Sequence, residues 1–131
     1  MKSVLFALRV SDLERSLAFY GAVGYVNLGK VPFEDGSSLV WLRLPDEQSV
    51  SLELVHRPAD GPVEVRGFEH FAIEVDSLAE TIARLTDNGL APGEPIVHGP
   101  DGPKTAWLTD PDGYRFELVE WPPGGPPSPE N

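Results

Sequence analysis

The chain contains no cysteine, so it has no disulfide bond, no thiolate ligand for a metal ion and no cysteine nucleophile. It also has little positive charge: 10 lysine and arginine residues stand against 21 aspartate and glutamate residues, and the formal net charge is −11. Nucleic-acid binding depends on clustered lysine and arginine, so this composition argues against it. An acidic surface instead tolerates, or weakly attracts, cationic small molecules.

Long apolar runs are missing as well. No stretch approaches the roughly 20 apolar residues that a membrane-spanning helix needs. The first residues do not have the form of a signal peptide, because Arg9 and Asp12 interrupt their apolar run and no small-residue cleavage site follows. We therefore expect a cytoplasmic protein. A glycine-rich phosphate loop, a metalloprotease motif and a serine-centred elbow are also absent from the sequence.

An internal repeat organises the residues that are present. Residues 5–13 align with residues 70–78, and residues 52–55 align with residues 116–119, in registers that differ by one residue. Such a repeat predicts two modules built on one plan. We expect a single domain at residues 1–121, with modules at about 1–57 and 67–121 and a linker at 58–66. The proline- and glycine-rich tail, residues 122–131, is predicted to be disordered.

Each module has the pattern of a strand, a helix and three further strands. Residues 3–10 alternate as a strand does, and residues 11–14 have the form of a capping box, which begins many helices. Residues 77–80 repeat this helix start, and Asn88 with Gly89 ends the second helix. The remaining strands are predicted near residues 25–31, 38–43 and 49–56, and near residues 94–98, 104–109 and 114–121. The sequence therefore predicts an α+β fold of two βαβββ modules.

Strand alternation places a set of polar side chains on the face that points away from the helices. Glu53 and Glu117 occupy equivalent positions of the two modules, each between two apolar residues that face the helix. By the same count, the face also includes Leu5, Arg9, His70 and Glu74. One imidazole and two carboxylates suit a divalent ion such as Ni²⁺, Co²⁺, Mn²⁺ or Zn²⁺.

Each of these residues also has a simpler interpretation. A single glutamate on a strand is usually a solvated surface residue, and His70 could be a hydrogen-bonded structural histidine. Arg9 and Glu74 could form a cross-strand ion pair. The repeat favours a shared site, because Glu53 and Glu117 occupy the same position of both modules, and a chance match is the competing explanation. His56 falls on the opposite face and His98 at the edge of a glycine- and proline-rich loop, so both are weaker candidates.

Several segments resemble the glyoxalase/bleomycin-resistance/dioxygenase superfamily, also known as the vicinal-oxygen-chelate (VOC) superfamily. Residues 8–20 are similar to its opening strand and helix, residues 66–73 to the start of its second module, and residues 110–118 to its closing hairpin. With residues 51–55 added, the resemblance covers residues 4–121. It implies curled mixed sheets around a cavity. The motifs are closest to those of glyoxalase I (lactoylglutathione lyase), but they specify the superfamily better than the activity.

In glyoxalase I, four side chains hold a divalent metal ion. Carried over position by position, the resemblance implies that Glu53, His70 and Glu117 are metal ligands in this chain. The fourth ligand position falls on Leu5, which has no ligating atom. Three protein ligands are sufficient in many catalytic metal sites. The resemblance further implies that Glu117, or Glu53, moves a proton of the substrate as the catalytic base.

The resemblance also indicates a class of substrate. Arg9 and Arg66 match arginines that help to hold the carboxylates of glutathione in glyoxalase I, whereas an asparagine with the same task appears here as Arg57. The implied enzyme is a metal-dependent lyase or isomerase that acts on a small α-oxo or thiohemiacetal substrate, such as a glutathione adduct. A homodimer is expected by the same analogy. Dioxygenase activity fits less well, because its iron site needs two histidines and one carboxylate.

A metal-free binding protein of the bleomycin-resistance type is the competing hypothesis. Leu5 favours it, and an acidic surface suits a cationic drug. Trp41, Trp107 and Tyr114 could stack on a planar ligand, although tryptophan is more often a core residue. Retention of all three remaining ligand residues favours the enzyme, because a binding protein does not need them.

Overall fold

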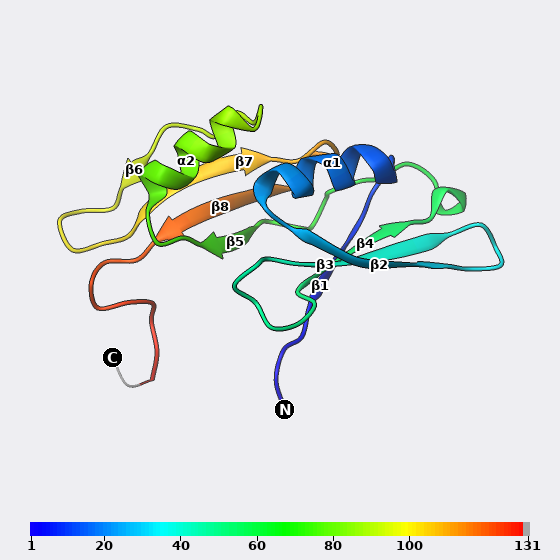
Figure 1. Cartoon of the computed structure of the whole chain (residues 1–131), viewed down its shortest axis with the longest axis horizontal. Helices are drawn as coiled ribbons and strands as arrows, with labels where there is room; N and C mark the ends of the chain where they lie inside the picture. The colour runs from blue at the N-terminus through cyan, green and yellow to red at the C-terminus, as the bar shows by residue number, and fades with distance from the viewer. Residues whose placement is uncertain (130–131) are drawn as a thin grey trace. The chain divides into compact units, whose positions relative to one another are not determined.

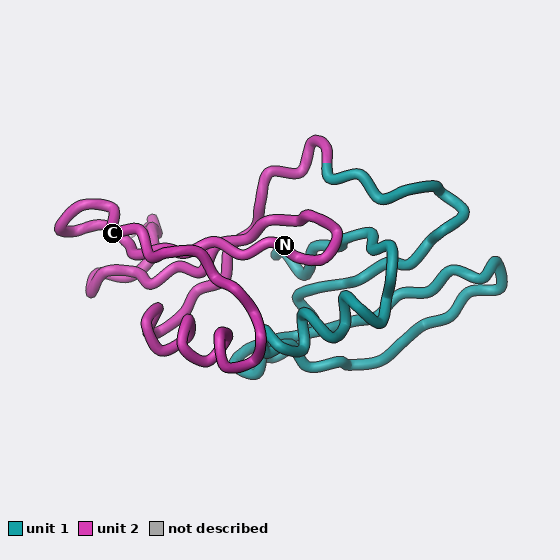
Figure 2. Tube along the Cα trace, turned by 90° about the horizontal axis from the view of Figure 1, so that it is seen from above, with its two compact units in different colours: residues 1–65 teal, residues 66–131 magenta. Residues whose placement is uncertain are grey.

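The computed structural model describes residues 1–129, and its chain divides into two compact units, residues 1–65 and 66–131 (Figures 1 and 2). Each unit contains one four-stranded mixed sheet and one α-helix. This arrangement confirms the predicted α+β fold and the βαβββ order of both modules. No helix in the described part of the chain is long and apolar enough to cross a membrane.

Unit 1 contains β1 (Phe6–Arg9), α1 (Leu13–Val23), β2 (Val26–Pro32), β3 (Ser38–Arg43) and β4 (Leu52–His56). Its strand order is β1-β4-β3-β2, in which β1 and β4 are parallel and the other neighbours are antiparallel. A short 3₁₀ helix at Pro58–Asp60 follows β4.

Unit 2 repeats this plan with β5 (Phe71–Glu74), α2 (Leu78–Asp87), β6 (Ile96–Val97), β7 (Lys104–Thr109) and β8 (Arg115–Glu120). Its strand order is β5-β8-β7-β6, again with the first pair parallel. The registers of the parallel pairs are equivalent, since Ala7 lies opposite Glu53 in one and Ala72 opposite Glu117 in the other.

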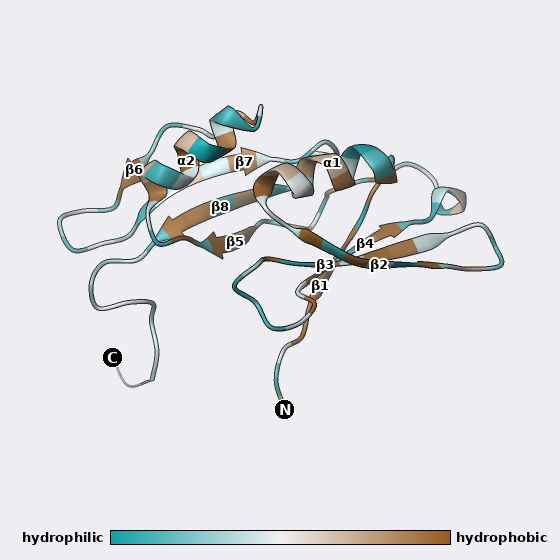
Figure 3. Cartoon of the chain, viewed as in Figure 1, coloured by the Kyte–Doolittle hydropathy of each residue, from teal (hydrophilic) through white to brown (hydrophobic). Residues whose placement is uncertain are grey.

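The apolar residues of the strands alternate with polar ones, and the apolar set forms a core in each unit (Figure 3). In unit 1, Leu54 and Val40 are fully buried, and Tyr20 on α1 is buried with them. In unit 2, Phe116 of β8 and Leu85 of α2 are fully buried. The face opposite each core is therefore free to carry polar side chains.

Both helices begin at a side chain that caps the first turn. Ser77 accepts a hydrogen bond from the Glu80 amide at 3.2 Å, as the sequence predicts. In α1 the cap is Asp12, which accepts from the Arg15 amide at 3.0 Å, so the capping box starts one residue later than predicted. The backbone of Asp12 is extended, and its carboxylate is as good a cap as a serine hydroxyl.

Several strands are shorter than the sequence predicts, among them β4, which starts at Leu52 and not near residue 49. β1 starts at Phe6, whose amide bonds to the Ser51 carbonyl at 3.3 Å, and Val4 before it is 61% exposed instead of facing the core. β6 contains only Ile96 and Val97. Pro95 precedes them and has no amide hydrogen to donate to the ladder, which accounts for the late start of β6.

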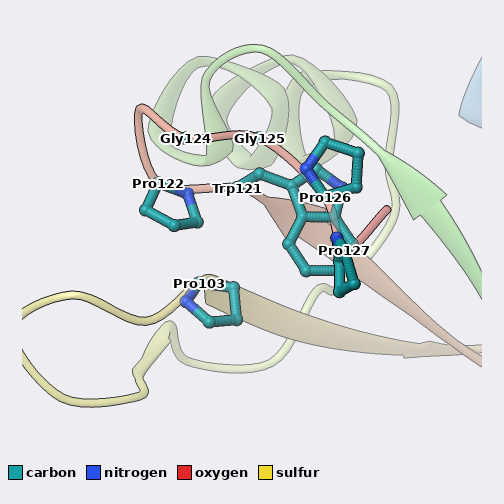
Figure 4. A pocket seen from close by; sticks show the side chains of 7 residues that line it. All are labelled: Pro103, Trp121, Pro122, Gly124, Gly125, Pro126 and Pro127. Atoms are coloured by element: carbon teal, nitrogen blue, oxygen red, sulfur yellow. The ribbon is translucent and has the colours of Figure 1, made fainter. Parts of the chain in front are cut away.

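The first residues of the C-terminal tail are folded back on Trp121. The Gly125 amide donates to the Pro122 carbonyl at 2.8 Å and closes a turn. A mostly apolar hollow of about 460 Å³ results (Figure 4), lined by Pro103, Trp121, Pro122, Gly124, Gly125, Pro126 and Pro127. None of these side chains is ionisable, so the hollow does not supply acid–base chemistry. Residues 130–131 of the tail lie outside the described residues.

Candidate functional site

Two of the predicted ligand residues meet in unit 2. His70 immediately precedes β5, and Glu117 lies on the neighbouring strand β8 opposite Ala72. The Nε2 atom of His70 is 3.8 Å from Oε1 of Glu117, and the two side chains are 33% and 22% exposed. The other ring nitrogen, Nδ1, lies 3.5 Å from a carboxylate oxygen of Glu69. His70 and Glu117 are thus close enough to act on one ion or one substrate atom.

Trp107 packs against this pair. It lies opposite Glu117 in the β7–β8 ladder, and its ring meets the His70 ring edge to face with centroids 4.9 Å apart. The guanidinium carbon of Arg115 lies 4.4 Å from the centroid of the same tryptophan ring, which is a cation–π contact. Trp107 therefore restricts the movement of His70, and Arg115 in turn restricts Trp107.

Glu53 has the equivalent surroundings in unit 1. It lies opposite Ala7 on β1 and opposite Trp41 on β3. Here the tryptophan makes a different contact, because Nε1 of Trp41 donates a hydrogen bond to Oε1 of Glu53 at 2.8 Å. The sequence predicted ligand stacking or core burial for both tryptophans and no contact with the glutamates. The strand register was the signal that could have identified them as neighbours of the two glutamates.

Leu5 immediately precedes β1, as His70 immediately precedes β5, so the two residues are equivalent in the repeat. The leucine is 38% exposed and supplies no ligand. Within residues 1–129, no group of three or more histidine, cysteine, aspartate or glutamate side chains has the spacing of a metal site. The available donors, one imidazole and two carboxylates, are nevertheless types that bind a divalent ion.

The predicted substrate-binding arginines have different surroundings. Nη2 of Arg9 donates to the backbone carbonyls of Arg57 at 3.2 Å and Gly61 at 2.8 Å, so Arg9 fixes the loop that follows β4. Arg57 itself pairs with Asp60 at 3.7 Å. Arg66 is exposed at the start of unit 2. The structure therefore shows a structural task for Arg9, and its role toward a substrate stays a prediction.

The two remaining histidines and Tyr114 lie apart from the pair formed by His70 and Glu117. His56 lies opposite Ser38 on the helix-facing side of its sheet, away from Glu53 as predicted. Nε2 of His98 is 2.8 Å from the hydroxyl of Thr105, so His98 is hydrogen-bonded within its own unit. Tyr114 is only 6% exposed, and the prediction that it could stack on a ligand is wrong, because it is buried in the core.

Comparison with known families now decides where the chain belongs. Residues 2–118 match the model of the Glyoxalase/Bleomycin resistance protein/Dioxygenase superfamily. The chain belongs to this superfamily. The match confirms the resemblance and the fold, and it agrees with the two βαβββ units described above.

Two named relatives within the superfamily are probable lactoylglutathione lyases. A probable lactoylglutathione lyase of Synechocystis sp. is 31% identical over 121 residues, which cover 86% of this chain and 90% of the relative. A probable chloroplastic lactoylglutathione lyase of Arabidopsis thaliana is 34% identical over 120 residues, and these span 86% of this chain but only 33% of the relative.

Two solved structures with this fold are named as proteins of different function. Glyoxalase I of Leishmania major has a TM-score of 0.73 at 29% identity and covers 92% of this chain and 86% of its own. The antibiotic-binding protein TnmS3 of Streptomyces sp. has a TM-score of 0.70 at 25% identity and covers 92% of this chain and 96% of its own. The same fold thus serves an enzyme and a binding protein among the structural neighbours.

Proposed function

We propose that this protein is a glyoxalase I-like, metal-dependent lyase or isomerase acting on a small α-oxo or thiohemiacetal substrate. The observation that carries the proposal is the pair His70 and Glu117, whose Nε2 and Oε1 atoms lie 3.8 Å apart on a partly exposed sheet face. The equivalent position in unit 1 holds a second carboxylate, Glu53. The names of the relatives, which are lactoylglutathione lyases, support the same reaction class.

Glu53, His70 and Glu117 are the residues that would hold a divalent ion, such as Ni²⁺, Co²⁺, Mn²⁺ or Zn²⁺. One imidazole and two carboxylates form an adequate set, since three protein ligands are sufficient in many catalytic sites. Such an ion supplies a Lewis acid that polarises a carbonyl or enediolate oxygen.

Glu117 is the proposed catalytic base, which takes the proton from the carbon next to the carbonyl and returns it to the neighbouring carbon. Glu53 is the less favoured candidate for the catalytic base, because its Oε1 already accepts a hydrogen bond of 2.8 Å from Trp41. Glu117 instead meets His70, and its side chain is 22% exposed and accessible to a substrate.

We propose that Arg66 and Arg9 bind the carboxylates of the substrate, for example those of a glutathione adduct. Arg66 is exposed, whereas Arg9 already donates to two backbone carbonyls and would have to share its guanidinium. A homodimer is part of the proposal, by analogy with the superfamily.

Metal stoichiometry tests the proposal directly. The protein is stripped with a chelator, reloaded separately with each of the four ions and measured by elemental analysis. Glu117→Ala removes a proposed ligand, and Glu74→Ala removes an exposed carboxylate from β5 of the same sheet as a matched control. We expect about one ion per chain in the wild type and in Glu74→Ala, and little in Glu117→Ala. Activity is then measured with methylglyoxal and glutathione.

Equal metal content in the wild type and Glu117→Ala would contradict the enzyme proposal. The second candidate would then apply: a metal-free small-molecule binding protein of the bleomycin-resistance type. Leu5 and the structural likeness to an antibiotic-binding protein favour it. Trp41, which is 39% exposed, offers the readout, because a planar cationic drug stacked on its ring would quench its fluorescence in the stripped protein.

A further inference from the structure

A polar cavity of about 400 Å³ lies in unit 1, away from the face that carries Glu53. It is found where α1 begins, at the carboxyl ends of the parallel strands β1 and β4. Lys30, Ser38 and His56 line it from the sheet, and Asp12 and Glu14 line it from the start of the helix. Ligands of sheet-and-helix folds commonly bind at such an edge, since helix amides converge there.

The strand register brings the three sheet residues to one side. Ser38 lies opposite His56 in the β3–β4 ladder and opposite Pro32 in the β2–β3 ladder. Lys30 precedes Pro32 by two residues, so it has the same orientation relative to the sheet. An ammonium, a hydroxyl and an imidazole therefore come from three adjacent strands to the same cavity.

None of these three side chains has a hydrogen-bond or ion-pair partner among residues 1–129. Ser38 is the most informative of them, because it is only 6% exposed and yet its hydroxyl lines the cavity. Its hydroxyl oxygen is accessible from the cavity, so it can donate a hydrogen bond to a bound group. A group that supplies acceptor oxygens within the cavity would accept from this hydroxyl and would also meet the ammonium of Lys30.

The helix end adds donors and also restricts what can bind. The first amides of α1 carry the positive end of the helix dipole. Asp12 uses one carboxylate oxygen to cap the Arg15 amide, and the Arg15 guanidinium lies 3.4 Å from the Ser11 hydroxyl at the same edge. Glu14 adds a negative charge to the rim, which opposes an anion, so the affinity is expected to be moderate.

We propose that this cavity binds a small oxyanion, either a phosphate or a carboxylate, whose oxygens accept hydrogen bonds from Lys30, Ser38 and His56. The residues lie on the opposite face of the sheet from Glu53, so the site is separate from the proposed metal site. The proposal stands or falls independently of the lyase activity.

Histidine-ring NMR on metal-free protein tests it, since the chain has only 3 histidines. Inorganic phosphate and acetate are titrated at constant pH and ionic strength, with chloride as the reference salt. We expect a saturable shift of the His56 signals with at least one of the two anions, at millimolar concentration, and no saturable shift with chloride. Phosphate alone, or acetate alone, would identify the class of oxyanion.

Variants test whether Lys30 and Ser38 donate the hydrogen bonds that hold the anion. Lys30→Gln should weaken binding about five- to ten-fold, whereas Lys2→Gln, which removes the same charge from the exposed N-terminus, should leave it within about two-fold. Ser38→Ala should weaken binding as well, and Glu14→Gln should strengthen it by removing the opposing charge. Circular dichroism checks the fold of Ser38→Ala, because Ser38 is buried, and Lys30→Gln remains decisive if that variant fails to fold.

Any of three results would overturn the proposal. The His56 signals could shift linearly with anion concentration, or they could shift by as much with chloride as with phosphate or acetate. The third result is an equal anion affinity of Lys30→Gln and Lys2→Gln. None of these results depends on whether the protein binds a metal ion.

Discussion

Trp41 and Trp107 occupy equivalent positions of the repeat and yet make different contacts. Trp107 is covered by the Arg115 guanidinium, whereas the residue equivalent to Arg115 in unit 1 is Ser51. The Ser51 hydroxyl donates to Glu47, so no cation stacks on Trp41. The ring of Trp41 instead aligns its N–H with Glu53. The two tryptophans thus have different neighbours: Arg115 and His70 lie beside Trp107, and the equivalent positions in unit 1 hold Ser51 and Leu5.

Trp41→Phe should weaken metal binding without unfolding the protein. The substitution keeps an aromatic ring but removes the N–H that orients the Glu53 carboxylate, and loss of such a supporting hydrogen bond costs about ten-fold or more in metal affinity. Isothermal titration with the best-bound ion measures the change. Trp121→Phe, in the C-terminal hollow, is the matched control and should keep the wild-type affinity. Equal affinities of the two variants would show that the hydrogen bond does not position Glu53.

Leu5→His should strengthen metal binding by about ten-fold or more, because it places an imidazole at the position equivalent to His70. Leu5 is 38% exposed, so the change does not disturb the core. Leu5→Ala removes the same side chain and adds no ligand, and it should bind no more tightly than the wild type. If Leu5→His and Leu5→Ala bind equally, the first strand of unit 1 does not contribute to the ion site.

At the scale of single residues, the sequence was sufficient to find the candidate ligands but not their contacts. Alternation and the repeat placed Glu53 and Glu117 at equivalent positions, because strand periodicity is a local property. The indole contacts of Trp41 and Trp107 could not be predicted, since a side-chain rotamer depends on the residues packed around it.

Among the secondary-structure elements, α2 is joined to the sheet of unit 2 by a carboxylate. Oε1 of Glu120 on β8 accepts a hydrogen bond from the Leu78 amide in the first turn of α2 at 2.9 Å. Its other oxygen lies 3.6 Å from Nζ of Lys104 on β7. The Leu78 amide lowers the pKa of Glu120 below its ordinary value of 4.5, and the charge of Lys104 adds to the effect.

This pKa shift predicts how acid affects stability. A lowered pKa in the folded state means that Glu120 stabilises the fold above pH 4.5, and that this contribution is lost as the pH falls below 4.5 through the folded-state pKa. Glu120→Gln should therefore be less stable than the wild type at pH 7, and the difference should shrink in acid. Urea unfolding at pH 7 and at about pH 3 measures it. Glu74→Gln, on an exposed carboxylate of β5, is the control and should show no such convergence.

Helix and strand positions were predictable where local chemistry decides them. Ser77 was identified correctly as a cap because serine before the first apolar turn is a strong signal. At α1 two good caps are adjacent, Ser11 and Asp12, and the sequence does not decide between them. β1 starts later than predicted because pairing with β4 begins only at Phe6, which is a property of the sheet and not of the segment.

At the scale of the whole molecule, the repeat was visible because each unit conserves its own alternating pattern and helix start. Strand register relates residues within one sheet, so it shows that His70 adjoins Glu117 and that Trp41 adjoins Glu53. It cannot relate a residue of unit 1 to a residue of unit 2. A three-ligand site therefore follows from the family resemblance, whereas a two-ligand pair follows from sequence and structure together.

Each unit has its own core, and equivalent leucines test how far the two cores are independent. Leu54 and Leu118 are 0% and 1% exposed, and they lie opposite Leu8 and Ile73 in equivalent parallel pairs. Truncation of either to alanine should cost about 2–5 kcal/mol through the cavity that it leaves. We expect Leu54→Ala to reduce amide hydrogen-exchange protection mainly in β3 and β4, and Leu118→Ala mainly in β7 and β8, because each leucine supports the sheet of its own unit. Equal loss of protection in all four strands for both variants would show instead that the two units unfold as one cooperative structure.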